Sequence, residues 1–110
     1  MVDVVVFRRW RDRSGDVIAL FPELPADVQG RYCNSYMHTG QHGGADYHSV
    51  IQHTAPVGPK QYAELAEVLW RIGYNLRPMK HASRRHHDKR RATARQLAAA
   101  DTKSPTKDKP

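Results

Sequence analysis

Residues 59–72 read PKQYAELAEVLWRI and have the most regular pattern in the chain. Proline suits the first position of a helix, where its missing N–H is not needed. Apolar side chains recur at helical spacing and form a single stripe: Tyr62, Leu65, Ala66, Leu69 and Ile72. Gly73 follows, where the C-terminal glycine of a helix belongs. The stretch predicts an amphipathic helix whose apolar stripe needs a sheet to cover.

The N-terminal residues, ahead of this helix, predict a β-hairpin. Residues 2–10 and 17–21 are rich in β-branched and aromatic side chains, and a turn at 13–16 separates them. The apolar runs are continuous rather than alternating, so we expect the hairpin to be covered at least in part on both faces. We expect Pro22 and Pro25 to end the second strand, because neither has the N–H that a central ladder requires.

Three shorter segments complete the predicted fold. Residues 31–36 predict a third strand, and residues 74–77 predict a final strand that stops at Pro78. Asp46 is suited to cap a short helical turn over residues 47–51, which we favour over a strand in the same place. The sequence therefore predicts an α+β fold of two layers, with a small antiparallel sheet of three or four strands packed by one main helix.

Charge divides the chain into two parts. Residues 1–76 carry seven Lys and Arg against eight Asp and Glu, a net charge of −1. Residues 77–110 carry eleven Lys and Arg against three Asp, a net charge of +8. We therefore expect a compact domain over residues 1–78 and a basic tail over residues 79–110. The tail contains strong helix formers but only Leu97 as a large apolar residue, so we expect it to be largely disordered or partly helical.

A basic arm of this kind is suited to a polyanion. Lysine and arginine bind phosphates and gain affinity by releasing counterions, without reading bases. We expect the tail to contact DNA or RNA through these residues: Lys80, Arg84, Arg85, Lys89, Arg90, Arg91 and Arg95. The alternative is a solvated tail that only aids solubility.

A polar, glycine-rich stretch at residues 33–47 reads CNSYMHTGQHGGADY. Its glycines argue against a regular helix, and its polarity argues against ordinary core. We expect a loop that shapes a surface for a protein or a small ligand. The candidate contact residues are Cys33, Ser35, Tyr36, His38, Gln41, His42 and Asp46.

The same stretch raises two catalytic or metal-binding alternatives. Zinc commonly takes Cys and His ligands, and the weak candidates are Cys33, His38, His42 and His48. Their spacing matches no familiar finger, so we expect no metal or other cofactor. A thiol nucleophile at Cys33 with a histidine base has the right residue types, but a cysteine in a predicted strand is more often an inert hydrophobe. We therefore favour a protein that is not an enzyme.

Several short runs carry a resemblance to a known group. They are Ala-Leu-Phe-Pro-Glu at 19–23, Ser-Tyr at 35–36, Gly-Gln-His-Gly at 40–43 and Ala-Asp-Tyr at 45–47. Over about residues 5–78 the chain resembles small uncharacterised bacterial proteins often encoded on plasmids and phages. The resemblance implies no activity and no catalytic residue. It suggests an alternative function, that of a mobile-element accessory protein that binds and modulates another protein.

Two further features concern the compartment. A single cysteine cannot form an intramolecular disulfide, which suits a reducing environment. The apolar run at the N-terminus is too short for a signal-peptide core or a membrane span. We expect a cytoplasmic protein that does not enter a membrane.

Overall fold

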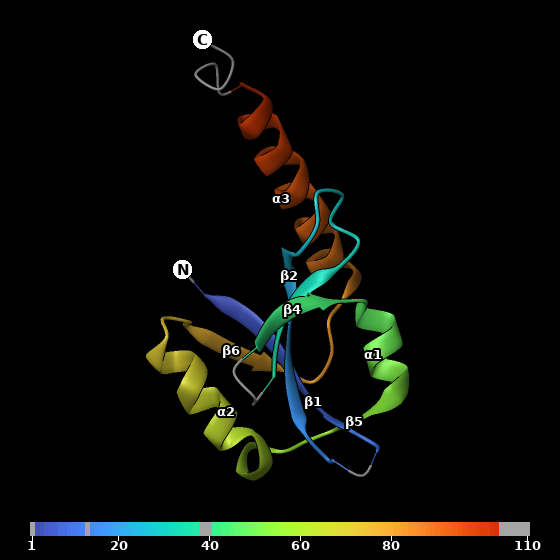
Figure 1. Ribbon diagram of the computed structural model, residues 1–110, viewed down its shortest axis with the longest axis vertical. Coiled ribbons are helices and arrows are strands. Elements are labelled where there is room, and N and C mark those ends of the chain that lie inside the picture. The colour runs from blue at the N-terminus through green and yellow to red at the C-terminus, as the bar shows by residue number, and fades with distance from the viewer. Residues whose placement is uncertain (1, 13, 38–40, 104–110) are drawn as a thin grey trace.

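The computed structural model of the chain describes residues 2–12, 14–37 and 41–103. Within these ranges six strands and three helices follow one another along the chain (Figure 1). In order they are β1 Asp3–Trp10, β2 Val17–Pro25, β3 Cys33–Met37, β4 Gln41–Ala45, α1 Tyr47–His53, β5 Thr54–Pro56, α2 Pro59–Arg71, β6 Leu76–Met79 and α3 Arg84–Lys103.

The strands form one sheet, in the order β4-β3-β2-β1-β5, and β6 also pairs with β1. Neighbouring strands are antiparallel, apart from β6, which runs parallel to β1. The strands β5 and β6 pair with different parts of β1, at residues 8–10 and residues 3–6 respectively. The structure confirms the α+β class, with six strands in the described residues where the sequence predicted three or four.

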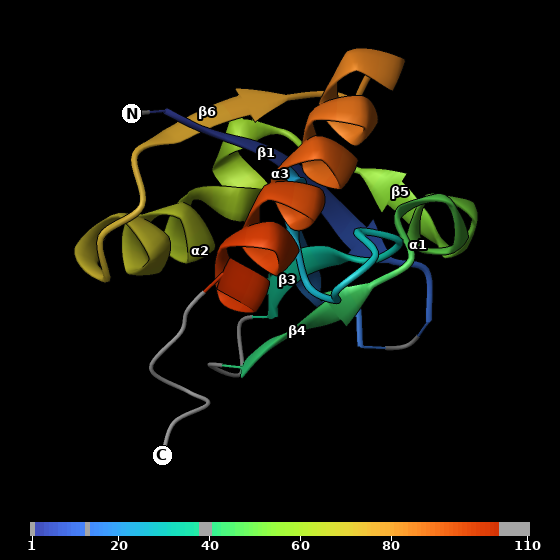
Figure 2. The same ribbon diagram turned by 90° about the horizontal axis from the view of Figure 1, so that it is seen from above.

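Apolar side chains on both faces of the β1–β2 hairpin create two cores. Alternate residues of a strand point to opposite faces, so a continuous apolar run supplies both. The core beneath α2 contains Val5, Phe7, Ala19, Phe21, Tyr36, Leu65 and Leu69. The core beneath α1 contains Val6, Ile18, Leu20, Cys33, Ala45, Tyr47 and Val50. Figure 2 shows α1 and α2 on opposite sides of the sheet, so the fold has three layers where two were expected.

Both predicted helices of the domain form. The helix α2 begins at Pro59 and buries Leu65 and Leu69 from its predicted stripe. It is followed by Gly73 at φ +116°, a conformation that favours glycine. The short helix α1 is capped by Asp46, whose carboxylate accepts a hydrogen bond from the Ser49 N–H at 3.4 Å. The preference for a helical turn over a strand after Asp46 is confirmed.

Pro25 is the last residue of β2, as predicted, but Pro22 and Pro78 do not end their strands. The register between β2 and β3 shifts between Phe21 and Pro25, so the ladder does not require an N–H from Pro22. The strand β2 therefore continues to Pro25. Likewise β6 continues through Pro78, because among the described strands it pairs with β1 alone and one side of its backbone needs no ladder partner.

The stretch expected to be a polar loop is largely a second hairpin. Its two arms are β3 and β4, which pair from Cys33 with Ala45 to Met37 with Gln41. The glycines of β4 permit a close approach, since a Cβ on Gly44 would lie 3.3 Å from the Cβ of Ala26. The expectation of a loop at residues 41–45 is therefore wrong, because backbone pairing with β3 compensates for their low strand propensity.

The basic stretch contains the helix α3, which packs against β2. Its contact face carries His87, Arg90 and Ala94, which are buried and recur at helical spacing. The far end of α3 projects beyond the body of the molecule (Figure 1). The expectation of partial helicity is confirmed, but the start of α3 is docked. The expected boundary after residue 78 falls inside β6.

No helix in the described residues is long and apolar enough to cross a membrane.

Candidate nucleic-acid interface and aromatic pocket

Arg90 fastens α3 to the sheet. Its Nε donates to the carbonyl of Gly30 at 2.9 Å, and its Nη1 donates to the carbonyl of Pro22 at 2.7 Å. The same Nη1 lies 2.7 Å from Nδ1 of His87, which must be the acceptor because arginine has only donors. Arg90 is 3% exposed, so it cannot contact a nucleic acid as the sequence predicted. Its guanidinium group instead donates hydrogen bonds to backbone carbonyls of the domain.

Gly30 lets the turn between β2 and β3 meet this helix. It has φ +74°, and a Cβ at this position would lie 3.0 Å from both the Cβ of Ala94 and the Cα of Arg91. Glycine is therefore required here for two reasons, the positive φ of the backbone and the close contact with α3. This close approach brings the Gly30 carbonyl to the Arg90 guanidinium.

His87 is the second polar group in this contact. Its ring lies 4.8 Å from that of Tyr47 and 5.2 Å from that of His48 between centroids, both on α1. Burial, followed by the positive charge of Arg90, lowers the pKa of His87 to about 4. Its Nε2 is buried and has no hydrogen-bond partner among the described residues. His87 is therefore neutral at pH 7 and accepts a hydrogen bond from Arg90.

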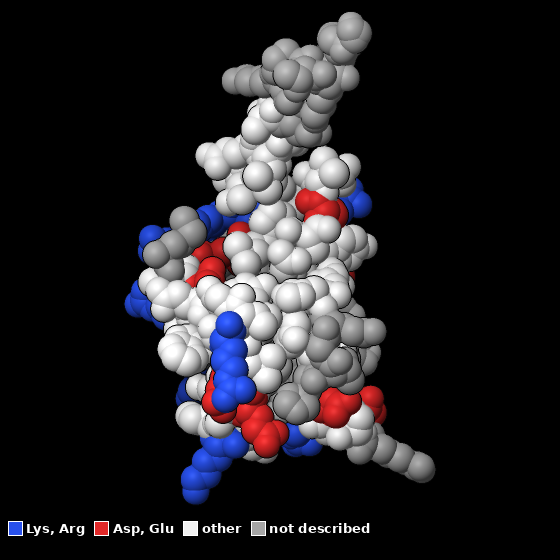
Figure 3. All heavy atoms as spheres, turned by 60° about the vertical axis from the view of Figure 1, so that its left-hand side comes forward, with Lys and Arg blue, Asp and Glu red and all other residues white. Residues whose placement is uncertain are grey.

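The remaining predicted contact residues are exposed. They are Lys80 after β6 and five residues of α3: Arg84, Arg85, Lys89, Arg91 and Arg95. Residues 84, 91 and 95 recur at helical spacing and share one side of the helix. Figure 3 shows Lys and Arg side chains gathered on the body near the base of the projecting helix, with carboxylates beside them. The structure therefore keeps six of the seven predicted cations at the surface.

Two of these cations have carboxylate neighbours. Nη1 of Arg91 lies 3.5 Å from Oδ1 of Asp88, one helical turn away, and both side chains are more than half exposed. Nζ of Lys89 lies 3.4 Å from Oε1 of Glu23 on β2. The exposed pair of Arg91 and Asp88 is worth about 0–1 kcal/mol, so a phosphate can replace that carboxylate at little cost.

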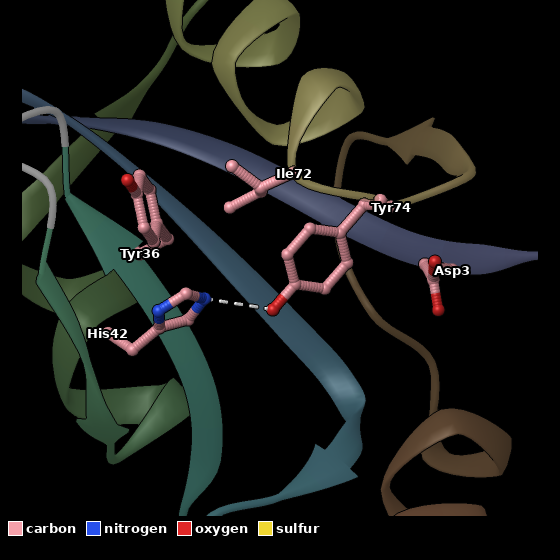
Figure 4. A pocket seen from close by; sticks show the side chains of 6 residues that line it. Asp3, Tyr36, His42, Ile72 and Tyr74 are labelled. Carbon is pink, nitrogen blue, oxygen red and sulfur yellow. Dashed lines mark hydrogen bonds between the residues drawn. The ribbon is translucent and has the colours of Figure 1, made fainter.

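The β3–β4 hairpin contributes to an aromatic pocket. His42 Nε2 shares a hydrogen bond of 3.0 Å with the hydroxyl of Tyr74, and the ring of Tyr36 lies 4.5 Å from that of His42 between centroids (Figure 4). Asp3, Ile72 and Gly73 complete the lining of a cavity of about 600 Å³. The hairpin and the segment after α2 therefore meet at one open hollow.

Sequence reasoning missed four of the pocket residues, namely Tyr74, Asp3, Ile72 and Gly73. Burial, followed by the nearby Asp3 and Tyr36, raises the pKa of the Tyr74 hydroxyl, so the group stays protonated at neutral pH. Its ring stacks on Phe21 at 4.5 Å between centroids, which fixes its position. The available signal was an aromatic residue directly after Gly73, the glycine that follows α2.

Three other predicted residues of the polar stretch, Cys33, Ser35 and Asp46, do not line this pocket. Cys33 is fully buried in the core beneath α1, and burial raises the pKa of its thiol to about 11, which is unsuitable for a nucleophile. Ser35 is also buried, and its hydroxyl donates to the Gly43 carbonyl at 3.0 Å. Asp46 caps α1. His38 and the side chain of Gln41 lie outside the described part of the chain.

The weak metal candidates are not gathered together where the structure describes them. Cys33 is buried, His42 faces Tyr74, and His48 lies on α1 near His87. Among residues 2–12, 14–37 and 41–103, no three His, Cys, Asp or Glu side chains are grouped to hold a metal ion.

Comparison with known proteins reveals no relative from which a function could be inferred. No protein-family model matches the chain, and no curated protein or solved structure is found to match it. The function must therefore be argued from the charges and the geometry of the chain itself.

Proposed function

We propose that the chain binds DNA or RNA, with little sequence preference, through the exposed basic side chains of α3. The observation that carries the proposal is that α3 has a buried face, which packs on the sheet, and exposed basic residues elsewhere. The buried contact face holds His87, Arg90 and Ala94, while Arg84, Arg85, Lys89, Arg91 and Arg95 are exposed. A cationic helix held on a body of slight negative charge presents its cations together to a polyanion.

The kind of contact follows from these side chains. Arginine and lysine neutralise phosphates and release counterions, and this part of the affinity does not depend on base sequence. Arginine adds a planar fork of donors that matches the oxygens of a phosphate. A cytoplasmic location is part of this proposal, because nucleic acids are present there and a reducing environment preserves the single thiol.

Fluorescence anisotropy with a labelled duplex tests the proposal. The double variant Arg91→Gln, Arg95→Gln should weaken binding about tenfold or more at low salt, since it removes two phosphate contacts. The double variant Lys60→Gln, Arg71→Gln on α2 removes the same charge from a remote helix and should bind nearly as well as the parent. Equal losses in the two variants would show that only net charge matters and would count against an interface on α3.

A second candidate function is that of an accessory protein of a mobile element, which binds and modulates another protein. Trp70 and Ile72 are 68% and 51% exposed, and Ile72 also lines the aromatic pocket. Tryptophan is enriched among the residues that dominate protein interfaces. The partner would contact Trp70 and Ile72 together with Tyr36 and His42 in the pocket.

The variant Trp70→Ser, Ile72→Ser separates the two candidates. If this surface binds a protein, the variant loses a stoichiometric complex that the parent forms in cell extract, while its affinity for duplex DNA is unchanged. A complex of undiminished yield would exclude this surface as the contact.

A further inference from the structure

A second hollow lies between α3 and the sheet, on the side of β6. It has a volume of about 550 Å³, and its lining includes Arg77 from β6 together with Arg85 and Lys89 from α3. Ser83, His86 and Glu23 also line it. Three cations from two separate elements therefore surround one cavity that contains one carboxylate.

We infer that this cavity is the seat of one backbone phosphodiester of the bound nucleic acid, with Arg77, Arg85 and Lys89 as its ligands. The inference rests on the proposed function, because it locates one contact within that interface. It also adds Arg77, a residue of the sheet, to a binding surface otherwise made by α3 and Lys80. A phosphate held between two elements would fix the nucleic acid relative to the body as well as to the helix.

The charges of the lining favour an anion. Arg77, Arg85 and Lys89 outnumber Glu23, which leaves two positive charges without counting His86. Arginine side chains donate in a planar fork, which suits a group with several acceptor oxygens such as a phosphate. The phosphodiester is chosen over other anions because Arg85 and Lys89, which line the cavity, are also part of the proposed interface on α3.

Glu23 lies close to two of the basic groups that line this cavity. Oε1 of Glu23 lies 3.4 Å from Nζ of Lys89, and Oε2 lies 4.0 Å from Nε2 of His86. The Glu23 side chain is only 15% exposed, whereas that of Lys89 is 64% exposed. The carboxylate is therefore the more buried partner and the ammonium the more exposed one. Lys89 can turn to a phosphate, while Glu23 remains and repels it.

The position of the cavity is fixed by the segment that joins β6 to α3. The Ala82 N–H donates to the hydroxyl of Tyr47 on α1 at 2.7 Å. The carbonyl of Ser83 accepts from the His86 N–H at 3.0 Å, which starts the helix beside the cavity. These bonds fix the short connection between the elements that carry Arg77 and Arg85, so the phosphate seat forms without a change in the fold.

Anisotropy with a labelled duplex lacking terminal phosphates tests the inference on the full chain. Arg77→Gln and Arg85→Gln should each weaken binding about five- to tenfold and lower the salt slope by about 1, as expected for one lost phosphate contact. Arg71→Gln, with the same charge change on α2, should leave the affinity within about twofold. Circular dichroism melting confirms that each variant is folded.

Removing the negative charge of Glu23 provides a second test, because it should change the binding affinity in the opposite direction. Glu23→Gln should tighten binding more than Asp88→Asn, although both remove one negative charge, because only Glu23 lines the cavity. If Arg77→Gln binds like Arg71→Gln and Glu23→Gln tightens binding no more than Asp88→Asn, the phosphate seat is wrong. The proposed function survives that result as long as the Arg91→Gln, Arg95→Gln variant is weakened. It fails together with the seat if the parent does not bind at low salt.

Nuclear magnetic resonance separates a backbone phosphate from a free phosphate ion. Titration of the labelled full chain with the duplex should shift the side-chain N–H signals of Arg77 and Arg85 at stoichiometric amounts. Inorganic phosphate at an equal phosphate concentration should leave them in place. Equal shifts with inorganic phosphate would overturn the assignment to the nucleic-acid backbone and identify a site for the free ion.

Discussion

Arg90 attaches the basic helix α3 to the rest of the domain. Its guanidinium donates to the carbonyls of Gly30 and Pro22 and to Nδ1 of His87, all within a buried contact. Removing a buried charged donor leaves its acceptors without partners, and the penalty is about 1–3 kcal/mol for each buried acceptor. Arg90, which the sequence predicted to bind phosphate, is therefore a structural residue.

The first prediction concerns this arginine. Arg90→Gln should lower the free energy of unfolding by about 3 kcal/mol, because it deprives the buried carbonyls of their donors. Its exposed neighbour offers a matched control, and Arg91→Gln should change the free energy by less than about 0.5 kcal/mol. Urea denaturation followed by circular dichroism measures both. Equal, small effects would mean that α3 is not held by Arg90.

The second prediction concerns the pH dependence of His87. Its pKa is lowered to about 4 by burial and by Arg90, from an unfolded value of 6.5. A group whose folded pKa is depressed contributes stability that is full above the unfolded pKa and is lost as the pH falls through the folded pKa. Stability should therefore fall between about pH 6.5 and pH 4 as His87 is forced to take up a proton.

His87→Asn supplies the control for that prediction. Asparagine offers an acceptor near the position of Nδ1 but does not titrate, so this part of the pH dependence should disappear. Other groups around the ring, namely His48, His86 and Arg91, remain in the variant. Urea denaturation at several pH values measures the difference between parent and variant. Parallel stability curves for the two proteins would contradict a neutral, buried His87.

At the level of elements, those with regular patterns could be predicted from the sequence. The stripe of Leu65 and Leu69 predicted α2, and Asp46 predicted the start of α1. The continuous apolar runs of the first hairpin predicted cover on both faces, which the two cores confirm. In each case a single local signal, either period or cap, decides the structure.

Elements that depend on distant partners could not be predicted. The strand β4 contains Gly43 and Gly44, which have low strand propensity, and it forms because β3 lies beside it. The docking face of α3 combines His87, Arg90 and Ala94, of which only Ala94 is apolar. No hydrophobic pattern marks such a face, because its hydrogen-bond acceptors come from carbonyls some sixty residues away in the chain.

The third prediction concerns the contact between α3 and the turn before β3. Gly30→Ala should destabilise the protein by more than Gly15→Ala. Both glycines have positive φ, of +74° and +61°, but a Cβ at residue 30 meets α3 at 3.0 Å, whereas a Cβ at residue 15 meets nothing within 4 Å. The backbone strain common to both is about 1–2 kcal/mol, so the excess measures the docking contact.

Amide hydrogen exchange locates the effect of that substitution. In Gly30→Ala the amides of α3 should lose protection more than those of α2, because the clash falls on Ala94 and Arg91. Gly15→Ala should leave the protection of α3 unchanged. Equal protection of α3 in the two variants would show that the helix does not depend on this contact.

For the whole molecule, the distribution of charge is the feature most closely connected with function. Residues 1–76 carry a net charge of −1, so the positive field of the chain comes from the part after them. The sequence predicted this division, but it did not predict that the basic part would be docked. Docking orients the cations, and it leaves Lys80 and five residues of α3 exposed on a folded support.

The salt dependence of duplex binding should differ between the full chain and the variant Arg84→Gln, Arg91→Gln, Arg95→Gln if α3 is the interface. The logarithm of the binding constant of the full chain should fall linearly with the logarithm of salt concentration, with a slope of about −4 to −5. The variant should lose about three units of slope, because each contact contributes about 0.9. Failure of the full chain to bind at low salt, or an unchanged slope in the variant, would contradict an interface on α3.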